Sequence, residues 1–319
     1  NAIIGAVTFT TNGTTGNVTI DNGTAAINIG TSSIAGSLTA ISGNGGGISD
    51  SGTVTVTGTG SFATDANSGV INLNQLAVTG ALTLNTNGTG TATIVNATAI
   101  DLAANTTIGG ATSITATTGN ITDSGTFTVG AGGATFVTTA NNATIALGTL
   151  AVTGDITLRT NDDAGADASA SITNATAISF GASTVDGALT AIATTGTITD
   201  TGALTVGGAG SFTTAQNNQV ITLDTTTNAI TGAVTFTTNG TTGNVTIDNG
   251  TTALDFAASS IDGSLTATSG NVGGITDSGT VTVTGAGSFT TDANSGVLNL
   301  NQLAVTGALT LNTNGTGTT

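Results

Sequence analysis

The chain is poor in charge and lacks several residue types altogether. Among its 319 residues there is one basic residue, Arg159, and no lysine, histidine, cysteine, methionine, tryptophan, tyrosine, proline or glutamate. Without histidine there is no base for a nucleophilic triad, and without cysteine there are neither disulfides nor thiolate ligands. The formal net charge of −16, which comes entirely from aspartate, excludes a basic surface for nucleic acid. No apolar run approaches the length that spans a bilayer, so we also expect no membrane insertion.

The residues that remain favour strands and turns. Threonine, valine and isoleucine are β-branched, whereas the 49 glycines and the many asparagines suit bends. The strong helix formers lysine, glutamate and methionine are missing. Apolar residues make up 37% of the chain and alternate with threonine and asparagine, which argues against a disordered low-complexity segment. The composition therefore predicts an all-β protein.

Internal repetition dominates the sequence. Residues 1–92 recur at 228–319, an offset of 227, with 15 mismatches over the 92 aligned positions. A shorter period lies inside this block, because the phrase I-[ST]-D-[ST]-G returns at steps of 73, 77 and 77 and is followed each time by a phenylalanine. The aspartates of this phrase are Asp50, Asp123, Asp200 and Asp277. The 227-residue block therefore consists of three units of about 76 residues.

A third, finer period predicts how the chain folds. Within each unit the pattern apolar-x-Gly-x-x-x-apolar recurs, and from Gly232 its glycines follow at steps of 31, 22 and 22. A coil of about 22 residues holds three short strands and three bends, and stacked coils pair equivalent strands. We therefore predict a right-handed parallel β-helix, a single continuous β-solenoid over residues 1–319 with three coils per unit.

Two structural alternatives stay open at this point. The enlarged coil of each 76-residue unit contains Asn-Gly pairs such as Asn12-Gly13 and Asn22-Gly23, which predict a protruding hairpin, an extra strand or a plain wider bend. The competing fold is an array of antiparallel β-sandwich domains, although such domains usually repeat at about 100 residues with less regular internal spacing.

The recurring aspartates invite a catalytic interpretation, because paired carboxylates hydrolyse glycosides. Asp50 and Asp123 are expected to lie three coils apart, about 14 Å, which is too far for them to cooperate. An aspartate followed by serine or threonine and then glycine is more typical of an Asx turn. We therefore predict no catalytic residue, and we predict that the chain is not an enzyme.

One segment breaks the repeat. Residues Arg159–Ser169 read RTNDDAGADAS and place three aspartates, Asp162, Asp163 and Asp167, beside the only arginine. Closely spaced carboxylates bind Ca²⁺, so these three residues are weak calcium-ligand candidates. A solvated acidic loop is the plainer interpretation, because the spacing matches neither an EF-hand loop nor the Gly-Gly-x-Gly-x-Asp calcium repeat. No other metal or cofactor is expected.

The phrases of the form G-x-[LIV]-T-[LFA], as at Gly80–Leu84, Gly154–Leu158 and Gly232–Phe236, carry a resemblance. The chain resembles the filamentous-haemagglutinin-like adhesins and other giant β-strand-repeat surface proteins of bacteria. The resemblance covers the whole chain through composition and period, and it implies a secreted right-handed β-helix shaft. It assigns no binding residue to this sequence.

The sequence thus predicts an extracellular structural protein that forms a rigid fibre or shaft at the cell surface or in a matrix. We expect it to associate with itself, end to end or laterally. The alternative is an adhesin, a binding module that displays glycan or calcium sites on a β-helix stalk. Binding residues should break the repeat, and only Arg159–Ser169 clearly does so.

Overall fold

A computed structural model describes residues 2–161 and 167–319. The chain divides into two compact units, 1–161 and 162–319. The described residues of both units form strands, bends and turns, and no helix there is long and apolar enough to cross a membrane. The continuity of one solenoid from residue 1 to residue 319 stays a prediction.

The strands of the first unit are β1 (Val18–Asp21), β2 (Ile27–Ile29), β3 (Ser32–Ile34), β4 (Leu38–Ser42), β5 (Ile48–Asp50), β6 (Val54–Val56), β7 (Gly60–Asn67), β8 (Ile71–Val78), β9 (Leu82–Asn87), β10 (Ala92–Asn96), β11 (Ile100–Leu102), β12 (Thr106–Ile108), β13 (Thr112–Ala116), β14 (Ile121–Asp123), β15 (Phe127–Val129), β16 (Ala134–Thr138), β17 (Ile145–Val152) and β18 (Ile156–Arg159). The strands of the second unit are β19 (Ala170–Asn174), β20 (Ile178–Phe180), β21 (Ser183–Val185), β22 (Leu189–Ala193), β23 (Ile198–Asp200), β24 (Leu204–Val206), β25 (Gly210–Asn217), β26 (Ile221–Leu223), β27 (Ala229–Ile230), β28 (Val234–Asn239), β29 (Val245–Asp248), β30 (Leu254–Phe256), β31 (Ser259–Ile261), β32 (Leu265–Ser269), β33 (Ile275–Asp277), β34 (Val281–Val283), β35 (Gly287–Asn294), β36 (Leu298–Asn299), β37 (Leu303–Val305) and β38 (Leu309–Asn314).

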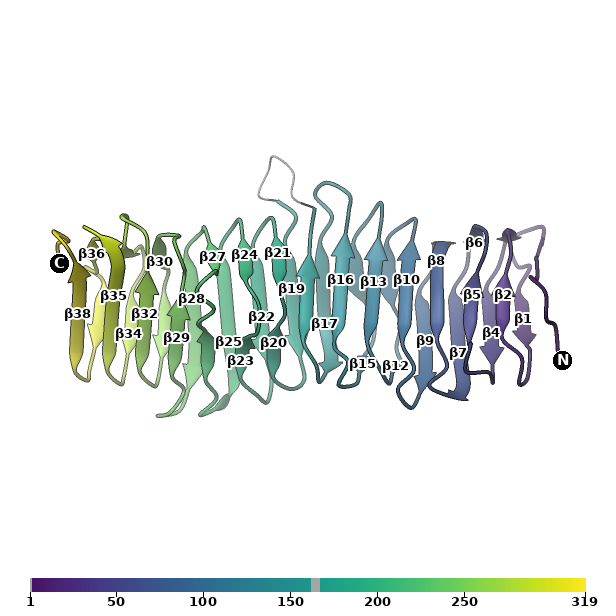
Figure 1. The fold of residues 1–319 in the computed structure, drawn as a ribbon, viewed down its shortest axis with the longest axis horizontal. Coiled ribbons are helices and arrows are strands. Elements are labelled where there is room, and N and C mark those ends of the chain that lie inside the picture. Colours follow the sequence, from purple (N-terminus) through teal and green to yellow (C-terminus); the bar gives the residue numbers. More distant parts are fainter. Residues whose placement is uncertain (1, 162–166) are drawn as a thin grey trace. The chain divides into compact units, whose positions relative to one another are not determined.

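Each unit is a stack of parallel coils (Figure 1). A regular coil has one longer strand on one sheet and two short strands on the other, as β4, β5 and β6 show. Strand β4 pairs in parallel with β7 of the next coil, and Leu38 lies opposite Gly60. In the described residues of both units the fold is an all-β parallel solenoid, whose coils follow one another about every 22 residues. The prediction of a parallel solenoid is confirmed and the antiparallel sandwich is wrong, whereas the right-handed sense stays a prediction.

The core follows from strand alternation, because every second side chain points inward. Strand β22 shows the pattern: Leu189, Ala191 and Ala193 are fully buried, while the residues between them are half-buried. Phenylalanines of successive coils contact one another inside the second unit, where Phe212 stacks on Phe236 with ring centroids 5.7 Å apart. Each such side chain contributes about 1.5–3 kcal/mol through burial.

The enlarged coil of each repeat contains an extra strand, one of the three forms expected from the sequence, rather than a hairpin or a plain wider bend. In the second unit its extra residues form β29, which is parallel to β26 and to β32. The chain there adds one longer strand, or half a coil, to a regular coil. Equivalent residues of successive repeats consequently lie on opposite sheets: Phe62 on one sheet and Phe136 on the other, and likewise Phe212 and Phe289.

The predicted three coils per 76-residue repeat are therefore corrected to about three and a half. The long step from Gly232 to Gly263 is one regular coil plus a half-coil strand and its bend. The odd number of half-coils is the reason that the pattern of long and short strands changes sheets once per repeat.

Glycine is required where two coils approach at a bend. Gly47 and Gly274 have φ angles of 64° and 66°, a left-handed conformation that other residues rarely adopt. A Cβ atom on either residue would lie 1.8 Å from a carbonyl oxygen of the next coil, that of Val70 or Val297 respectively. These glycines fix the entry into β5 and β33.

Candidate functional site

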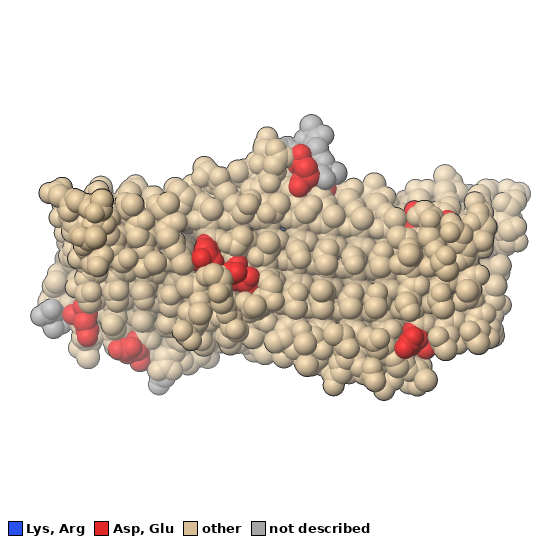
Figure 2. Space-filling model, turned by 180° about the vertical axis from the view of Figure 1, so that it is seen from behind, with Lys and Arg blue, Asp and Glu red and all other residues tan. Residues whose placement is uncertain are grey.

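The charged side chains of the chain are few and separated. Figure 2 shows acidic side chains in a few isolated places on one face, with wide uncharged surface between them. Among the described residues, no three potential ligands gather in a group that could hold a metal ion. The specific polar contacts in the described residues are therefore those of individual aspartates and asparagines.

Most of the calcium candidates lie outside the described part of the chain. Asp162 and Asp163 belong to residues 162–166, which are not described. Asp167 is exposed, and its backbone N–H donates to the carboxylate of Asp186 at 3.1 Å. Asp186 is 8% exposed and also accepts the N–H of Ala168 at 3.4 Å, so it fixes the start of the strand that follows the acidic segment. The calcium site stays a prediction.

The recurring aspartates bind backbone of the following coil. Asp50 ends β5, where its chain turns away, while β8 of the next coil continues past that point. The N–H groups of Asn74 and Gln75 in β8 therefore face no carbonyl of the coil beneath. The two carboxylate oxygens of Asp50 accept these N–H groups at 3.1 and 2.8 Å. We call this arrangement the aspartate clamp.

The clamp recurs in both units. Asp123 accepts the N–H groups of Gly148 and Thr149 at 2.8 and 2.7 Å and the hydroxyl of Thr149 at 2.9 Å. Asp277 accepts those of Asn301 and Gln302 at 2.9 and 2.8 Å. The predicted Asx turn at these aspartates is wrong, because the carboxylates reach residues that lie 24–26 positions later in the chain.

A second recurring device uses asparagine. The buried amide of Asn96 accepts the N–H of Val78 at 2.8 Å and donates to the carbonyl oxygen of Val78 at 2.9 Å. Asn249 makes the same two bonds with Ile230, at 2.8 and 3.0 Å. We call this pair of bonds the asparagine clamp. Each lies at the end of the extra strand, where the chain turns away while the coil beneath continues to Val78 or Ile230, and the amide replaces the missing peptide group.

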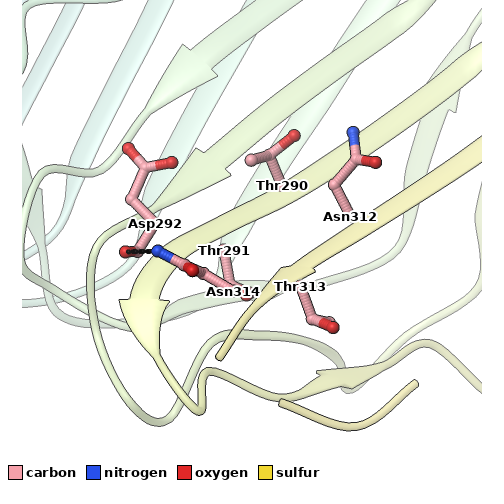
Figure 3. A pocket seen from close by; sticks show the side chains of 6 residues that line it. All are labelled: Thr290, Thr291, Asp292, Asn312, Thr313 and Asn314. Atoms are coloured by element: carbon pink, nitrogen blue, oxygen red, sulfur yellow. Dashed lines mark hydrogen bonds between the residues drawn. The ribbon is translucent and has the colours of Figure 1, made fainter. Parts of the chain in front are cut away.

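A hollow lies at β35 and β38 in the second unit. It has a volume of about 390 Å³ and is lined by Thr290, Thr291, Asp292, Asn312, Thr313 and Asn314. Figure 3 shows the amide of Asn314 bonded to the carbonyl oxygen of Asp292, at 3.2 Å. None of the lining residues is aromatic, so the hollow offers no ring that could stack on a sugar.

Comparison with known proteins identifies the repeats. Residues 15–85, 165–237 and 242–299 match the family described as "Repeats of unknown function (DUF5649)". The chain belongs to this family. The last two matches begin at positions 165 and 242, and the step between them equals the step between Asp200 and Asp277. No curated protein and no solved structure matches the chain.

In these DUF5649 repeats, one carboxyl group has a shifted pKa. Burial raises the pKa of Asp248 above its usual 3.8, and the nearby carboxylates of Asp292, Asp224 and Asp200 raise it further. The N–H of Gly250 donates to Asp248 at 2.8 Å and acts in the opposite direction. This is an Asx turn, and it lies at an Asp-Asn-Gly phrase rather than at the recurring Asp-[ST]-Gly.

Sequence reasoning missed the asparagines of the DUF5649 repeats. Asn22, Asn96, Asn174 and Asn249 recur at steps of 74, 78 and 75, which is the same period as the aspartates, and all four are buried. A polar residue that recurs once per repeat in an apolar alternation is the signal that could have revealed them. Their burial and hydrogen bonds mark them as structural.

Proposed function

We propose that this chain is a structural protein, a stretch of shaft on or outside the cell that acts through its length and stiffness. The proposal rests on what the polar residues that recur once per repeat contact. Asp50 and Asp277 bind backbone of the following coil, while Asn96 and Asn249 bind backbone of the preceding one. Side chains that recur in this way join coils, and every added repeat extends the stack by the same contacts.

A non-enzymatic role agrees with the placement of the carboxylates. A glycosidase needs two carboxyl groups about 5–10 Å apart. Asp50 and Asp123 belong to opposite sheets of the first unit, and each already accepts two backbone N–H groups. The sequence also lacks histidine and lysine, the bases that commonly activate serine or threonine as a nucleophile, and it lacks cysteine.

The location outside the cell is part of the same proposal. It is supported by the resemblance of the Gly-x-[LIV]-Thr phrases to filamentous-haemagglutinin-like surface proteins, for example at Gly80–Leu84. A net charge of −16 with a single arginine would also keep neighbouring shafts apart in solution.

An adhesin is the second candidate, favoured by one groove in the first unit. The groove has a volume of about 230 Å³, with exposed amides beside apolar side chains, and its lining residues are Thr53, Asn74, Gln75, Leu76, Val95, Ala97 and Thr117. Amides above an apolar floor are groups that a glycan could contact. If the groove binds glycan, Gln75→Ala should abolish a signal on a glycan array that Gln302→Ala, its counterpart in the recurring block, preserves.

Electron microscopy tests the shaft proposal directly. Antibodies raised against the purified chain should label the surface of intact cells of the source organism. Negative stain of material released from those cells should show long unbranched shafts that the antibody decorates. Labelling confined to the interior of permeabilised cells, or compact particles as the only labelled species, would overturn the proposal.

A further inference from the structure

The sequence contains seven Asn-Gly phrases, a dipeptide whose asparagine can lose its side-chain amide. In this reaction the glycine nitrogen attacks the side-chain carbonyl carbon of the asparagine, and glycine has no side chain to hinder the approach. Ammonia leaves, and water opens the succinimide ring that results. In a folded chain the rate depends on how the structure holds the two reacting atoms.

Two of these phrases occupy the same place in their repeats and share one local sequence. Asn87-Gly88 and Asn239-Gly240 each lie in the tetrapeptide Thr-Asn-Gly-Thr. Asn87 ends β9 and Asn239 ends β28, and each of these long strands precedes the extra strand of its repeat. Both glycines have positive φ angles, 62° and 79°. A difference in reactivity between the two phrases would therefore come from the surrounding coils.

At Asn87 the side chain folds back over the glycine nitrogen. The N–H of Gly88 donates to Oδ1 of Asn87 itself at 2.8 Å. Because a carbonyl bond is about 1.2 Å long, Cγ of Asn87 lies within about 4 Å of the nitrogen that would attack it. Reacting atoms begin from a separation of about 3–3.5 Å. Asn87 and Gly88 are both exposed, so water and hydroxide reach them.

At Asn239 the glycine N–H has a different partner. The N–H of Gly240 donates to Oδ2 of Asp262, in the following coil, at 2.9 Å. The attack requires this nitrogen to lose its proton, and the adjacent carboxylate opposes the formation of a second negative charge. The amide of Asn239 is bound to the coil beneath, where it donates to the carbonyl oxygen of Thr214 at 3.2 Å.

The difference arises from one position of the repeat. Asp262 directly follows β31, and the equivalent residue of the first unit, directly after β12, is Gly109. Glycine has no carboxylate that could accept the N–H of Gly88. That N–H therefore remains available to the side chain of its own asparagine, Asn87.

The phrases at Asn22 and Asn249 have the same kind of protection as the phrase at Asn239. In each of them the glycine N–H donates to the aspartate that precedes the phrase, Asp21 or Asp248, at 2.8 Å. Both asparagines are also buried and hold the asparagine clamps or their equivalents. Aspartate thus protects the asparagines on which the stack depends.

We propose that Asn87-Gly88 deamidates spontaneously in the folded chain, whereas Asp262 protects Asn239-Gly240. Hydroxide removes the proton from the Gly88 nitrogen, which forms a bond to Cγ of Asn87. The Cγ–Nδ2 bond then breaks, and the leaving nitrogen takes a proton from water, which releases ammonia and restores the hydroxide. Water opens the succinimide at either carbonyl carbon. Opening at Cγ gives aspartate, and opening at the backbone carbon gives isoaspartate, in which the main chain continues through Cγ.

Either product changes this bend. Aspartate adds a negative charge, and isoaspartate adds one atom to the main chain. The following coil leaves no room for an added atom here, because even a Cβ on Gly109 would overlap the carbonyl oxygen of Gly88. The isoaspartyl form therefore disturbs the contact between β9 and β12. Because ammonia is lost, the change accumulates with the age of the chain.

Mass spectrometry of the full chain tests the proposal. The protein is incubated at mildly alkaline pH, folded or in urea, and digested with pepsin at low pH, which stops the reaction. A deamidated peptide is heavier by the difference between a hydroxyl and an amino group. In urea, Asn87 and Asn239 should react at equal rates. In the folded chain Asn87 should react at least about tenfold faster than Asn239, in proportion to the hydroxide concentration.

The variant Asp262→Ala removes the protecting carboxylate and introduces the residue that the recurring block has at Ala35. It should raise the rate at Asn239 by about tenfold and leave the rate at Asn87 unchanged. Circular dichroism checks that the variant is folded. Equal rates at the two asparagines in the folded parent, or an unchanged rate at Asn239 in the folded variant, would overturn the proposal. Neither result depends on whether the chain forms a shaft.

Discussion

The side-chain amide of Asn96 pairs with the backbone of Val78 as a peptide group would, accepting its N–H at 2.8 Å and donating to its carbonyl oxygen at 2.9 Å. Asn96 is fully buried. The pair lies where the chain adds half a coil, and β8 continues to Val78, past the point where the shorter β10 ends at Asn96. The asparagine clamp thus provides the hydrogen bonds that the change of sheet would otherwise leave unmade.

Replacing Asn96 by alanine should destabilise the first unit. The N–H of Val78 would be left buried without a partner, at about 1–3 kcal/mol, while its carbonyl oxygen would keep the bond from the hydroxyl of Thr98 at 2.7 Å. We expect the free energy of unfolding to fall by about 1–3 kcal/mol in urea titrations followed by circular dichroism. Asn72→Ala, at an exposed position of the neighbouring β8, should change it by less than about 0.5 kcal/mol. Similar losses in the two variants would contradict the clamp.

The aspartate clamp predicts a contrast between two aspartates of the same unit. Asp123 accepts three hydrogen bonds from Gly148 and Thr149, whereas Asp65 is exposed. Asp123→Ala should lower the free energy of unfolding by about 1–3 kcal/mol, since its partly exposed bonds are charge-assisted. Asp65→Ala should be neutral or slightly stabilising, because it removes one negative charge from a chain of net charge −16. Thermal melts of the two single variants measure this difference in stability.

Much of the fold could be predicted because repetition amplifies a weak local signal. One Gly-bounded strand phrase says little, but the same phrase at equal steps, as at Gly263, Gly285 and Gly307, implies stacked coils. The half-coil escaped this reasoning. The longer step from Gly232 to Gly263 is compatible with a hairpin, a wide bend or an extra strand, and only pairing of β29 with its neighbours distinguishes them.

The roles of the recurring aspartates could not be predicted from local sequence. An Asx turn is a contact between residues two positions apart, so Asp-[ST]-Gly suggests one at Asp50. The structure places the partners of Asp50 at Asn74 and Gln75, because β8 bridges a turn that the coil beneath makes. That arrangement arises because the single strand β8 pairs with both β5 and β6 of the coil beneath. The residues around Asp50 do not indicate that the next coil has one strand at this place.

Two buried side-chain oxygens in the described part of the first unit, Oδ1 of Asn28 and Oδ1 of Asp101, have no hydrogen-bond partner. Oδ1 of Asp101 is buried without a hydrogen bond, while both oxygens of Asp255, at the same place in its repeat, accept hydroxyl groups of Thr276 and Ser278 at 3.0 and 2.6 Å. Another repeat has Ser179 there. Asp101→Ser should therefore raise the free energy of unfolding by about 1 kcal/mol, and Asp255→Ser should lower it by a similar amount. The charge change is identical, so equal shifts in denaturant midpoint would refute this account.

Asp248 predicts a pH dependence of defined sign. Its pKa in the folded chain is raised above 3.8, mainly by burial. The ionised carboxylate of Asp248 therefore destabilises the folded chain at pH values above about 3.8. Asp248→Asn keeps an oxygen acceptor for the N–H of Gly250 and removes the charge. The variant should be more stable than the parent at pH 7, and the difference should vanish as the pH falls below about 3.8. A stability difference that grows on acidification, in melts from pH 3 to 7, would reverse the sign and refute the prediction.

The half-coil rule predicts which deletions the second unit tolerates. Removing Asp200–Thr276 takes out one full repeat and joins Thr199 to Asp277, two equivalent places in the repeat. That stretch is about three and a half coils, so everything after the junction moves to the opposite sheet while strand phase, bends and inward-facing residues are conserved. The stack should shorten by about 17 Å, at about 4.8 Å per coil, and keep its melting temperature within a few degrees.

The comparison variant lacks Asp200–Gly270, a deletion that is shorter by about a quarter of a coil. The new junction then joins places that are not equivalent in the repeat, so it places bends against strands and turns apolar side chains toward water. Each large side chain exposed in this way loses about 1.5–3 kcal/mol, so the shorter deletion should be the far more damaging one. Circular dichroism and small-angle scattering of the two variants measure stability and length together. Equal damage would mean that the repeats do not stack through equivalent coils, and the shaft function would lose its structural basis.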